Sequence, residues 1–283
     1  MVGATEHPSV ITAVTRYAEA GYCAIDWIPV DRHGRVDLAA LGAHIEGAAG
    51  LFLMAVNNET GVVQDLEAVS ELVASAGLPW HADLVAAAGK IPIDLSAHAC
   101  RGITTASMSA HKCGGPHGVG ALYLRQRHDM TPLFPGLLQE DGRRAGTPNL
   151  AGIVAFGAAM GVAVDPNLRA LRDRLAHALL EALPGSRING DPEHDDGRTL
   201  NVSVRRGGDW IDAEDELLEL AAHGIAASTG AACVTGSGQP SHVLLAMGVS
   251  PEEAMASLRF SFGEGNTAGD VDAVLAALTR DGT

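Results

Sequence analysis

Short apolar segments alternate with amphipathic segments through the first half of the chain. The periodicity of hydrophobic positions predicts helices over residues 7–21, 38–48 and 66–77. It predicts strands over residues 23–30, 50–56, 79–83, 102–108 and 119–125. The letters NNETG at residues 57–61 indicate a turn. Short apolar strands between amphipathic helices are typical of an α/β fold, with a mainly parallel sheet flanked by helices.

The pattern changes in the second half of the chain. After an irregular stretch, two long helices are predicted over residues 149–164 and 167–184. The remainder mixes shorter strands and helices in an α+β pattern. We therefore expect a large domain over residues 1–148, followed by bridging helices and a small C-terminal domain over residues 149–283.

Composition and charge restrict the classes of protein that fit. The formal net charge of −15 disfavours binding to nucleic acid or to an anionic membrane surface. No apolar run approaches the roughly 20 residues that a membrane span needs, and the first residues do not resemble a secretory signal, so we expect a cytoplasmic protein. The four cysteines form no CxxC pair, which argues against a zinc site and a disulfide framework.

Lys112 is the first candidate for chemistry. Lys90 and Lys112 are the only lysines among 19 basic residues, and the others are arginines. Lys112 follows a predicted strand and precedes glycines, at the strand end where α/β proteins usually bind ligands. A Schiff base requires a primary amine, which arginine cannot supply. A structural role for Lys112 remains the alternative, whereas Lys90 fits a solvated surface cation.

Asp83 and Cys233 are two further candidates. Asp83 ends the predicted strand 79–83, where a carboxylate is often a helix cap or a solvated loop residue, and it becomes a candidate as the companion of Lys112. Cys233 lies in the glycine-rich segment AACVTGSGQPSH, which predicts an exposed loop with a reactive thiol. The other cysteines, Cys23, Cys100 and Cys113, fit small hydrophobic residues.

Eight segments, in order, resemble one known family. They are EHPSV, NNETGVVQDL, HADLVAAAGKIPIDL, SAHKCGGPHGVGALYLR, RRAGTPNLAGIVAFGAA, TLNVSV, STGAACVTGSGQPSHVLLAMG and SLRFSFG. They resemble the cysteine desulfurases, which belong to the class V aminotransferase group of fold-type I enzymes dependent on pyridoxal 5'-phosphate (PLP). The resemblance implies a PLP transferase-like fold and an enzyme.

The resemblance implies roles for the residues around the cofactor. Lys112 would carry PLP covalently and move protons at the substrate, and Asp83 would pair with the nitrogen of the pyridine ring. His7 would stack on that ring and assist proton transfer. Ser109 and His111 match positions that bind the phosphate.

The resemblance also implies roles in substrate binding and sulfur transfer. Asn58 would lie near the phenolic oxygen of the cofactor and the substrate carboxylate, and Arg259 would clamp that carboxylate. Thr147 would reach the phosphate of the partner subunit in a homodimer. Cys233 would take sulfur from L-cysteine as a persulfide, leave L-alanine, and pass the sulfur to an acceptor protein in iron–sulfur cluster assembly or thiolation.

The sequence departs from the family pattern in three places. The N-terminal part of the pattern, including a loop that contributes to the phosphate site, has no counterpart in the chain. Ala86 stands where the family has a glutamine, and Leu137 and Leu138 replace glycines. These departures keep two other functions open: a non-catalytic binding subunit, or one half of a split desulfurase complemented by an N-terminal polypeptide. A related activity, selenocysteine lyase, is a third alternative.

Overall fold

The computed structural model describes residues 1–125, 131–162, 165–229 and 238–280. The chain forms two compact units, each of which draws on separate parts of the sequence. Unit 1 contains Met1–Ala48, Met54–Asp65 and Asp165–Thr283, and unit 2 contains Ala49–Leu53 and Leu66–Val164. Among the described residues, no helix is both long and apolar enough to cross a membrane.

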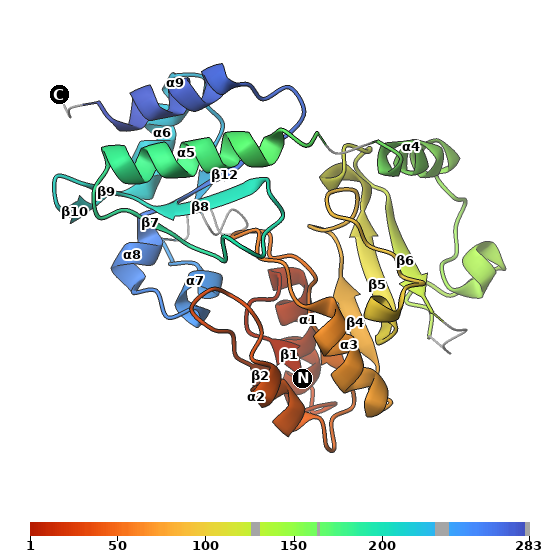
Figure 1. Ribbon diagram of the computed structural model, residues 1–283. Coiled ribbons are helices and arrows are strands. Elements are labelled where there is room, and N and C mark those ends of the chain that lie inside the picture. Colours follow the sequence, from red (N-terminus) through yellow and green to blue (C-terminus); the bar gives the residue numbers. More distant parts are fainter. Residues whose placement is uncertain (126–130, 163–164, 230–237, 281–283) are drawn as a thin grey trace. The chain divides into compact units, whose positions relative to one another are not determined.

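Unit 2 is built on a sheet that follows the predicted strands. Its strands are β3 (Leu51–Phe52), β4 (Trp80–Asp83), β5 (Ile103–Ser109) and β6 (Gly120–Leu124). The first three run parallel to each other, and β6 runs antiparallel to β5 (Figure 1). The connection between β5 and β6 holds only a short helical turn, η2 (Ala110–Lys112), which is too little for the crossover that parallel strands require. The predicted α/β class is confirmed.

Helix α3 (Leu66–Ser75) packs closely on the turn that leads into β5. It buries Val69, Ser70 and Val73. Gly102 permits this close approach, because an added Cβ would lie 2.6 Å from Val73 Cγ2 and 2.8 Å from Ser70 Cα. The other helical segments of unit 2 are η1 (His98–Cys100), η3 (Gln139–Gly142) and α4 (Leu150–Met160).

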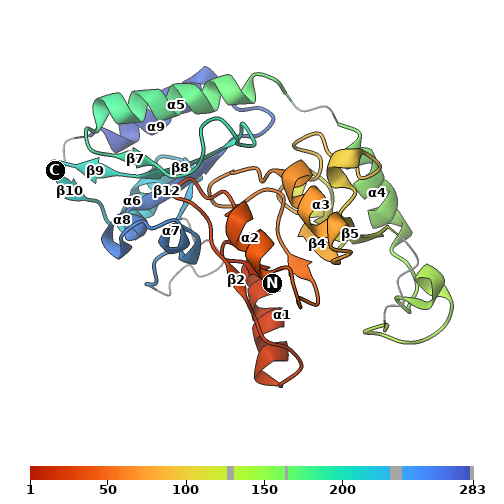
Figure 2. The same ribbon diagram turned by 60° about the horizontal axis from the view of Figure 1, so that its bottom comes forward.

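Unit 1 contains a separate antiparallel sheet in the order β11-β12-β8-β7. Its strands are β7 (Arg187–Ile188), β8 (Thr199–Ser203), β11 (Ser228–Thr229) and β12 (Ser257–Ser261). Figures 1 and 2 show α5 and α9 side by side along this sheet. Helices α5 (Leu168–Ala182), α6 (Ala213–Ala222) and α9 (Ala268–Leu278) share a core with β8 and β12, formed by Leu175, Leu179, Leu200, Val202, Leu220, Leu258, Phe260, Val271 and Val274.

The rest of unit 1 consists of short elements from both ends of the chain. They are β1 (Val2–Gly3), α1 (Pro8–Glu19), β2 (Trp27–Ile28), α2 (Leu38–His44), β9 (Arg205–Arg206), β10 (Asp209–Trp210), α7 (His242–Ala246) and α8 (Pro251–Met255). Strand β2 is shorter than predicted because its partner β1 offers only Val2 and Gly3 for pairing, and because Pro29, which follows β2, has no N–H to donate. Strand β3 of unit 2 is also short. The N–H of Met54, two residues after it, donates instead to Glu6 Oε1 at 2.5 Å.

The predicted turn at residues 57–61 is fixed by its own side chains. Asn57 Oδ1 accepts the main-chain N–H groups of Glu59 at 2.9 Å and Thr60 at 3.0 Å. Gly61 closes the turn with φ of 76°, where a side chain would be strained and its Cβ would lie 2.9 Å from Asp196 Oδ1. The sequence NNETG therefore folds locally into one defined turn.

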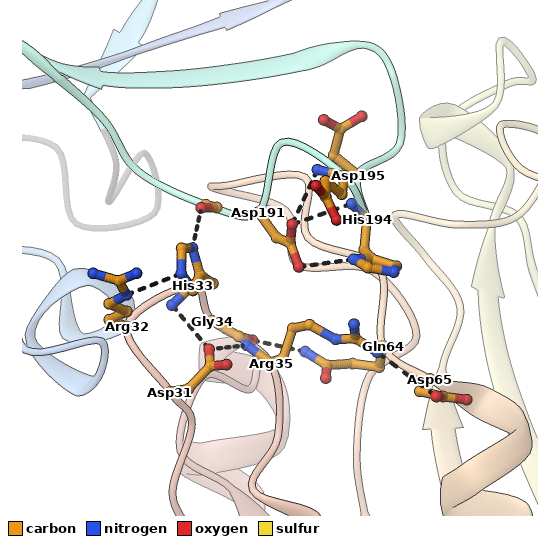
Figure 3. A network of polar contacts seen from close by, with 12 residues as sticks. Asp31, Arg32, His33, Gly34, Arg35, Gln64, Asp65, Asp191, His194 and Asp195 are labelled. Carbon is orange, nitrogen blue, oxygen red and sulfur yellow. Dashed lines mark hydrogen bonds and ion pairs between the residues drawn. The ribbon is translucent and has the colours of Figure 1, made fainter.

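The residues that follow this turn are bound to the loop at residues 31–35, which a polar network orders. Asp31 Oδ1 accepts the N–H of His33 at 2.8 Å and of Arg35 at 3.0 Å (Figure 3). The side chain of Gln64 donates to the carbonyl of Gly34 at 2.9 Å. On the other side, Val62 forms a β-bridge with Asp195. The turn at residues 57–61 is thus bound within unit 1 to segments far away in the sequence.

Candidate functional site

One face of β4 and β5 in unit 2 is polar and partly buried. His81 Nδ1 lies 2.8 Å from Thr105 Oγ1, and His81 Nε2 lies 3.3 Å from Ser107 Oγ. Burial lowers the pKa of His81, and the charge of Asp83 opposes that effect. Since side chains alternate along a strand, His81 and Asp83 share this face. Several polar side chains thus converge on this face, as they do in ligand sites.

Asp83 lies at the carboxyl end of β4, as predicted. It is 7% exposed. Its Oδ1 accepts the N–H of Val85 at 2.8 Å, so the carboxylate also caps the turn that follows the strand. Asp83 pairs with Ser107 in the register between β4 and β5. The two strand ends therefore present their polar groups together.

Lys112 lies in a tight turn directly after β5. The carbonyl of Ala110 accepts N–H groups from both Cys113, at 3.1 Å, and Gly115, at 2.8 Å. A Cβ on Gly115 would lie 3.0 Å from Ala110 Cβ, so the glycine keeps the turn closed. Lys112 itself is exposed at the surface of unit 2. The turn thus presents a primary amine beside the carboxyl end of β5.

One hydroxyl group and two imidazole rings lie near Lys112 in the sequence. Ser109 Oγ and His111 Nδ1 form a hydrogen bond of 2.7 Å. The ring of His111 stacks on the ring of His117, with centroids 5.1 Å apart and an interplanar angle of 13°. Hydroxyl and imidazole groups can donate hydrogen bonds to an anion. Ser109 and His111 therefore form a compact group of donors.

In unit 1, the structure brings Arg259 and Asn58 together. Arg259 lies in β12, where it is paired with Ser228 on one side and Asn201 on the other. Its Nη1 donates to the main-chain carbonyl of Asn58 at 3.0 Å, and its Nη2 donates to Ser228 Oγ at 3.3 Å. The guanidinium group is therefore oriented by two elements beside the turn at residues 57–61.

His7 begins helix α1 of unit 1. It occupies the N-cap position, and its Nδ1 accepts the N–H of Ser9 at 3.2 Å. Its ring also lies 2.8 Å from Ser9 Oγ. Pro8 at the first helical position fits this start, because a proline has no N–H to satisfy there. The ring is half-buried and held locally.

The remaining predicted residues divide between the units or lie outside the described chain. Thr147 is exposed in unit 2, just ahead of α4. Cys233 lies outside the described residues. Unit 2 thus carries Asp83, Ser109, His111, Lys112 and Thr147, and unit 1 carries His7, Asn58 and Arg259.

Two residues with perturbed ionisation were not predicted from the sequence. His81 precedes Asp83 by two positions, and strand alternation could have placed both on one face. Glu59 lies inside the turn at residues 57–61, only 4% exposed. Its burial is produced by residues far along the chain, so no local pattern indicates it.

Comparisons with known proteins identify relatives across the chain. The sequence model of one family, Aminotransferase class-V, matches residues 1–274. A cysteine desulfurase from Gluconacetobacter diazotrophicus is 39% identical over 282 residues, covering 97% of this chain and 69% of that protein. The cysteine desulfurase NifS of Azotobacter vinelandii is 38% identical, covering 95% of this chain and 67% of that protein. The uncovered part of these relatives is their N-terminal portion.

Solved structures agree with the sequence relatives. A NifS-like protein superposes with a TM-score of 0.87 at 32% identity, covering 98% of this chain and 73% of that one. The X-ray structure of a NifS-like protein from Rickettsia africae gives a TM-score of 0.84 at 28% identity, with the same coverage. Sequence and structure therefore point to the same relatives.

Proposed function

Because the chain belongs to the aminotransferase class-V family, we propose that it is a PLP-dependent cysteine desulfurase. It would convert L-cysteine to L-alanine and leave the sulfur as a persulfide on Cys233. The cytoplasm suits this chemistry, because thiols stay reduced there.

The observation that carries the proposal is the group of polar residues at the carboxyl ends of β4 and β5. The buried carboxylate of Asp83, the donors of Ser109 and His111, and the amine of Lys112 lie on adjacent strand ends of unit 2. This donor set suits PLP, which carries a ring nitrogen, a phosphate and an aldehyde. Ala86 has only a methyl group where the family offers a glutamine side chain, so we expect weaker binding at the phenolic oxygen.

Each of the predicted site residues would have its own role in the reaction. PLP, when bound, withdraws electrons from the substrate Cα and so makes its proton acidic. Asp83 would keep the ring nitrogen protonated, and Lys112 would hold the cofactor and move the proton at Cα. Arg259 would bind the substrate carboxylate beside Asn58, a task that suits its planar set of donors. His7 would stack on the ring and assist proton transfer.

Cys233 would perform the sulfur step. Its thiolate attacks Sγ of the substrate, and an S–S bond forms as the Cβ–Sγ bond of L-cysteine breaks. The electron pair of the broken bond stays with the alanine moiety, which takes up a proton and leaves as L-alanine. The persulfide then passes its outer sulfur to an acceptor protein of iron–sulfur cluster assembly or thiolation.

A second copy of the chain would complete each site through Thr147. Mixing Lys112→Ala protein with Thr147→Ala protein tests this. If Thr147 serves the partner, mixed dimers contain one site with both residues intact, and part of the activity returns. Mixed dimers can be isolated through a different affinity tag on each variant, and no recovery of activity in them would contradict the role of Thr147.

The binding of PLP is tested by absorbance. Purified protein incubated with PLP should develop a band near the edge of the visible range, which is lost in Lys112→Ala. Lys90→Ala is the matched control, since it removes the other lysine of the chain, and it should keep the band. A colourless wild-type protein would contradict the enzyme proposal and favour a binding subunit or a split enzyme.

The reaction is tested by the products from L-cysteine. Wild-type protein should release equimolar L-alanine and sulfide in the presence of a thiol, and Cys233→Ser should not form a persulfide. Full persulfide transfer by Cys233→Ser would exclude Cys233 as the sulfur carrier. A much higher rate with selenocysteine would identify a selenocysteine lyase instead.

A further inference from the structure

Glu59 is a buried carboxyl group that the proposed reaction leaves unused. Its Oε2 accepts a hydrogen bond of 2.5 Å from Ser241 Oγ, and the same hydroxyl accepts the N–H of Leu244 at the start of α7. Burial is the largest influence and raises the pKa of Glu59 from 4.5 to about 7. The bond from Ser241 and the charge of Arg259 act in the opposite direction. Near neutral pH, both forms of Glu59 are therefore populated.

The turn at residues 57–61 links this carboxyl group to Arg259. The guanidinium group donates to the carbonyl of Asn58, the neighbour of Glu59. Asn201, which lies opposite Arg259 in the sheet, donates from Nδ2 to the carbonyl of Glu59 at 3.3 Å. Two adjacent carbonyls of the turn are thus fixed to β12 and its neighbour β8. These bonds fix the main chain of Glu59 to the strand that carries Arg259 and to its neighbour, while Ser241 holds the carboxyl group itself.

The other titratable groups around Glu59 are held in bonds of their own. On α7, His242 Nε2 lies 2.9 Å from the carbonyl of Glu6. The carboxylate of Glu6 accepts the N–H of Met54. On the far side of the turn, Asp196 accepts N–H groups from Arg198 and Thr199. Arg259 is the charged side chain whose field acts on Glu59.

We propose that Glu59 is a positioning residue whose ionisation is coupled to substrate binding at Arg259. Glu59 takes up a proton when the substrate carboxylate binds to the guanidinium group. With Glu59 ionised, part of the field of Arg259 is already compensated. With Glu59 neutral, the full positive charge is available to the incoming carboxylate. Because two carboxylates in the field of one guanidinium repel each other, substrate binding favours the proton on Glu59. The inference rests on the proposed function, since it takes Arg259 as the residue that binds the substrate carboxylate.

The coupling predicts a particular dependence of KM on pH. Above the pKa of Glu59, substrate binding must take up a proton, so KM for L-cysteine rises with pH. We expect a rise of about tenfold between pH 7 and pH 9, within the usual range of coupling between two sites. Glu59→Gln keeps the shape of the side chain but cannot ionise, so the KM of this variant should lack the rise with pH that Glu59 causes. The ratio of wild-type to Glu59→Gln KM removes the titrations of L-cysteine and the cofactor, which are common to both proteins.

Ser241 provides a second variant that tests the coupling without touching Arg259. Ser241→Ala removes a hydrogen bond that stabilises the ionised form, so the pH at which KM begins to rise should move upward. Ser241→Thr keeps the hydroxyl group and should restore the wild-type profile. A structural effect of residue 241 alone would change the rate without moving the pH profile.

A direct titration of Glu59 decides between the possible outcomes. Carbon-13 spectra of the full chain with PLP, labelled at glutamate carboxyl groups, assign Glu59 as the signal lost in Glu59→Gln. The midpoint of its titration in wild type should lie near pH 7. The midpoint should be higher in Arg259→Gln, and it should also be higher in wild type after L-alanine is added. A midpoint near pH 4.5, or one that ignores Arg259→Gln, would overturn the inference even in an active enzyme. If the midpoint responds to Arg259→Gln but the protein neither binds L-alanine nor consumes L-cysteine, the proposed function fails and the substrate role of Glu59 fails with it.

Discussion

The buried carboxyl group of Glu59 also has a consequence for stability. In the folded protein its pKa is about 7, against 4.5 for an exposed glutamate. The folded state therefore holds this proton more tightly than the unfolded chain does. The contribution of Glu59 to the free energy of unfolding is greatest below pH 4.5, falls as the pH rises from 4.5 to 7, and changes no further above pH 7.

The pKa values set the size of the effect. One pH unit corresponds to about 1.36 kcal/mol, so a pKa raised from 4.5 to about 7 corresponds to about 3 kcal/mol. Solvent screening reduces this little, because Glu59 is only 4% exposed. Glu59→Gln cannot ionise and keeps a polar group beside Ser241. We expect this variant to gain up to about 3 kcal/mol over wild type at pH 8.5, and to lose most of that advantage at pH 5.

Urea unfolding, followed by circular dichroism at pH 5, 6, 7 and 8.5, measures the effect. The informative quantity is the difference in the free energy of unfolding between Glu59→Gln and wild type, in which the titration of all other groups cancels. The exposed carboxyl group of Glu46 offers the control Glu46→Gln, which removes a charge of unit 1 at the surface. A difference for Glu59→Gln that is the same at pH 5 and pH 8.5 would refute the reasoning.

Three further predictions concern other contacts. Asp195 is buried with Arg172, whose Nη2 lies 2.7 Å from its Oδ2, so Asp195→Ala should cost about 3 kcal/mol in urea unfolding, because it leaves the buried arginine with only the exposed Asp173. Arg172→Met in the same chain should restore part of the loss, since the N–H of Gly197 also loses its acceptor. Gly102→Ala should cost about 1–3 kcal/mol, because the new Cβ would meet the backbone of α3 at 2.8 Å. Arg259→Lys should lower kcat/KM for L-cysteine about 100-fold, mainly through KM, since lysine lacks the planar pair of donors; an unchanged KM would exclude Arg259 as the carboxylate clamp.

The sequence pattern predicted much of the sheet in unit 2. Predicted strands 79–83 and 102–108 correspond to β4 and β5, and so Asp83 and Lys112 were placed at strand ends before the structure was known. Strand direction was harder to predict, because β6 has the same apolar pattern whether it runs parallel or antiparallel. Strand length was also harder to predict where the partner strand is short, as β1 is beside β2.

The predictions were less complete in the C-terminal part of the chain. The hairpin of β9 and β10 was missed although Gly207 and Gly208 between them are a known signal for a two-residue turn. Helix α8 was missed although Ser250 and Pro251 are typical of a helix start. Glu59 is different in kind. Its burial depends on Ser241, a partner 182 residues away, which no local pattern can indicate.

The bond between Arg259 and the turn at residues 57–61 uses the peptide carbonyl of Asn58. Every amino acid supplies that carbonyl, so exchanging the amide at position 58 leaves the orientation of the arginine untouched. The two positions are therefore separable by mutagenesis. In a related chain, residue 58 could therefore be replaced without a compensating substitution at residue 259.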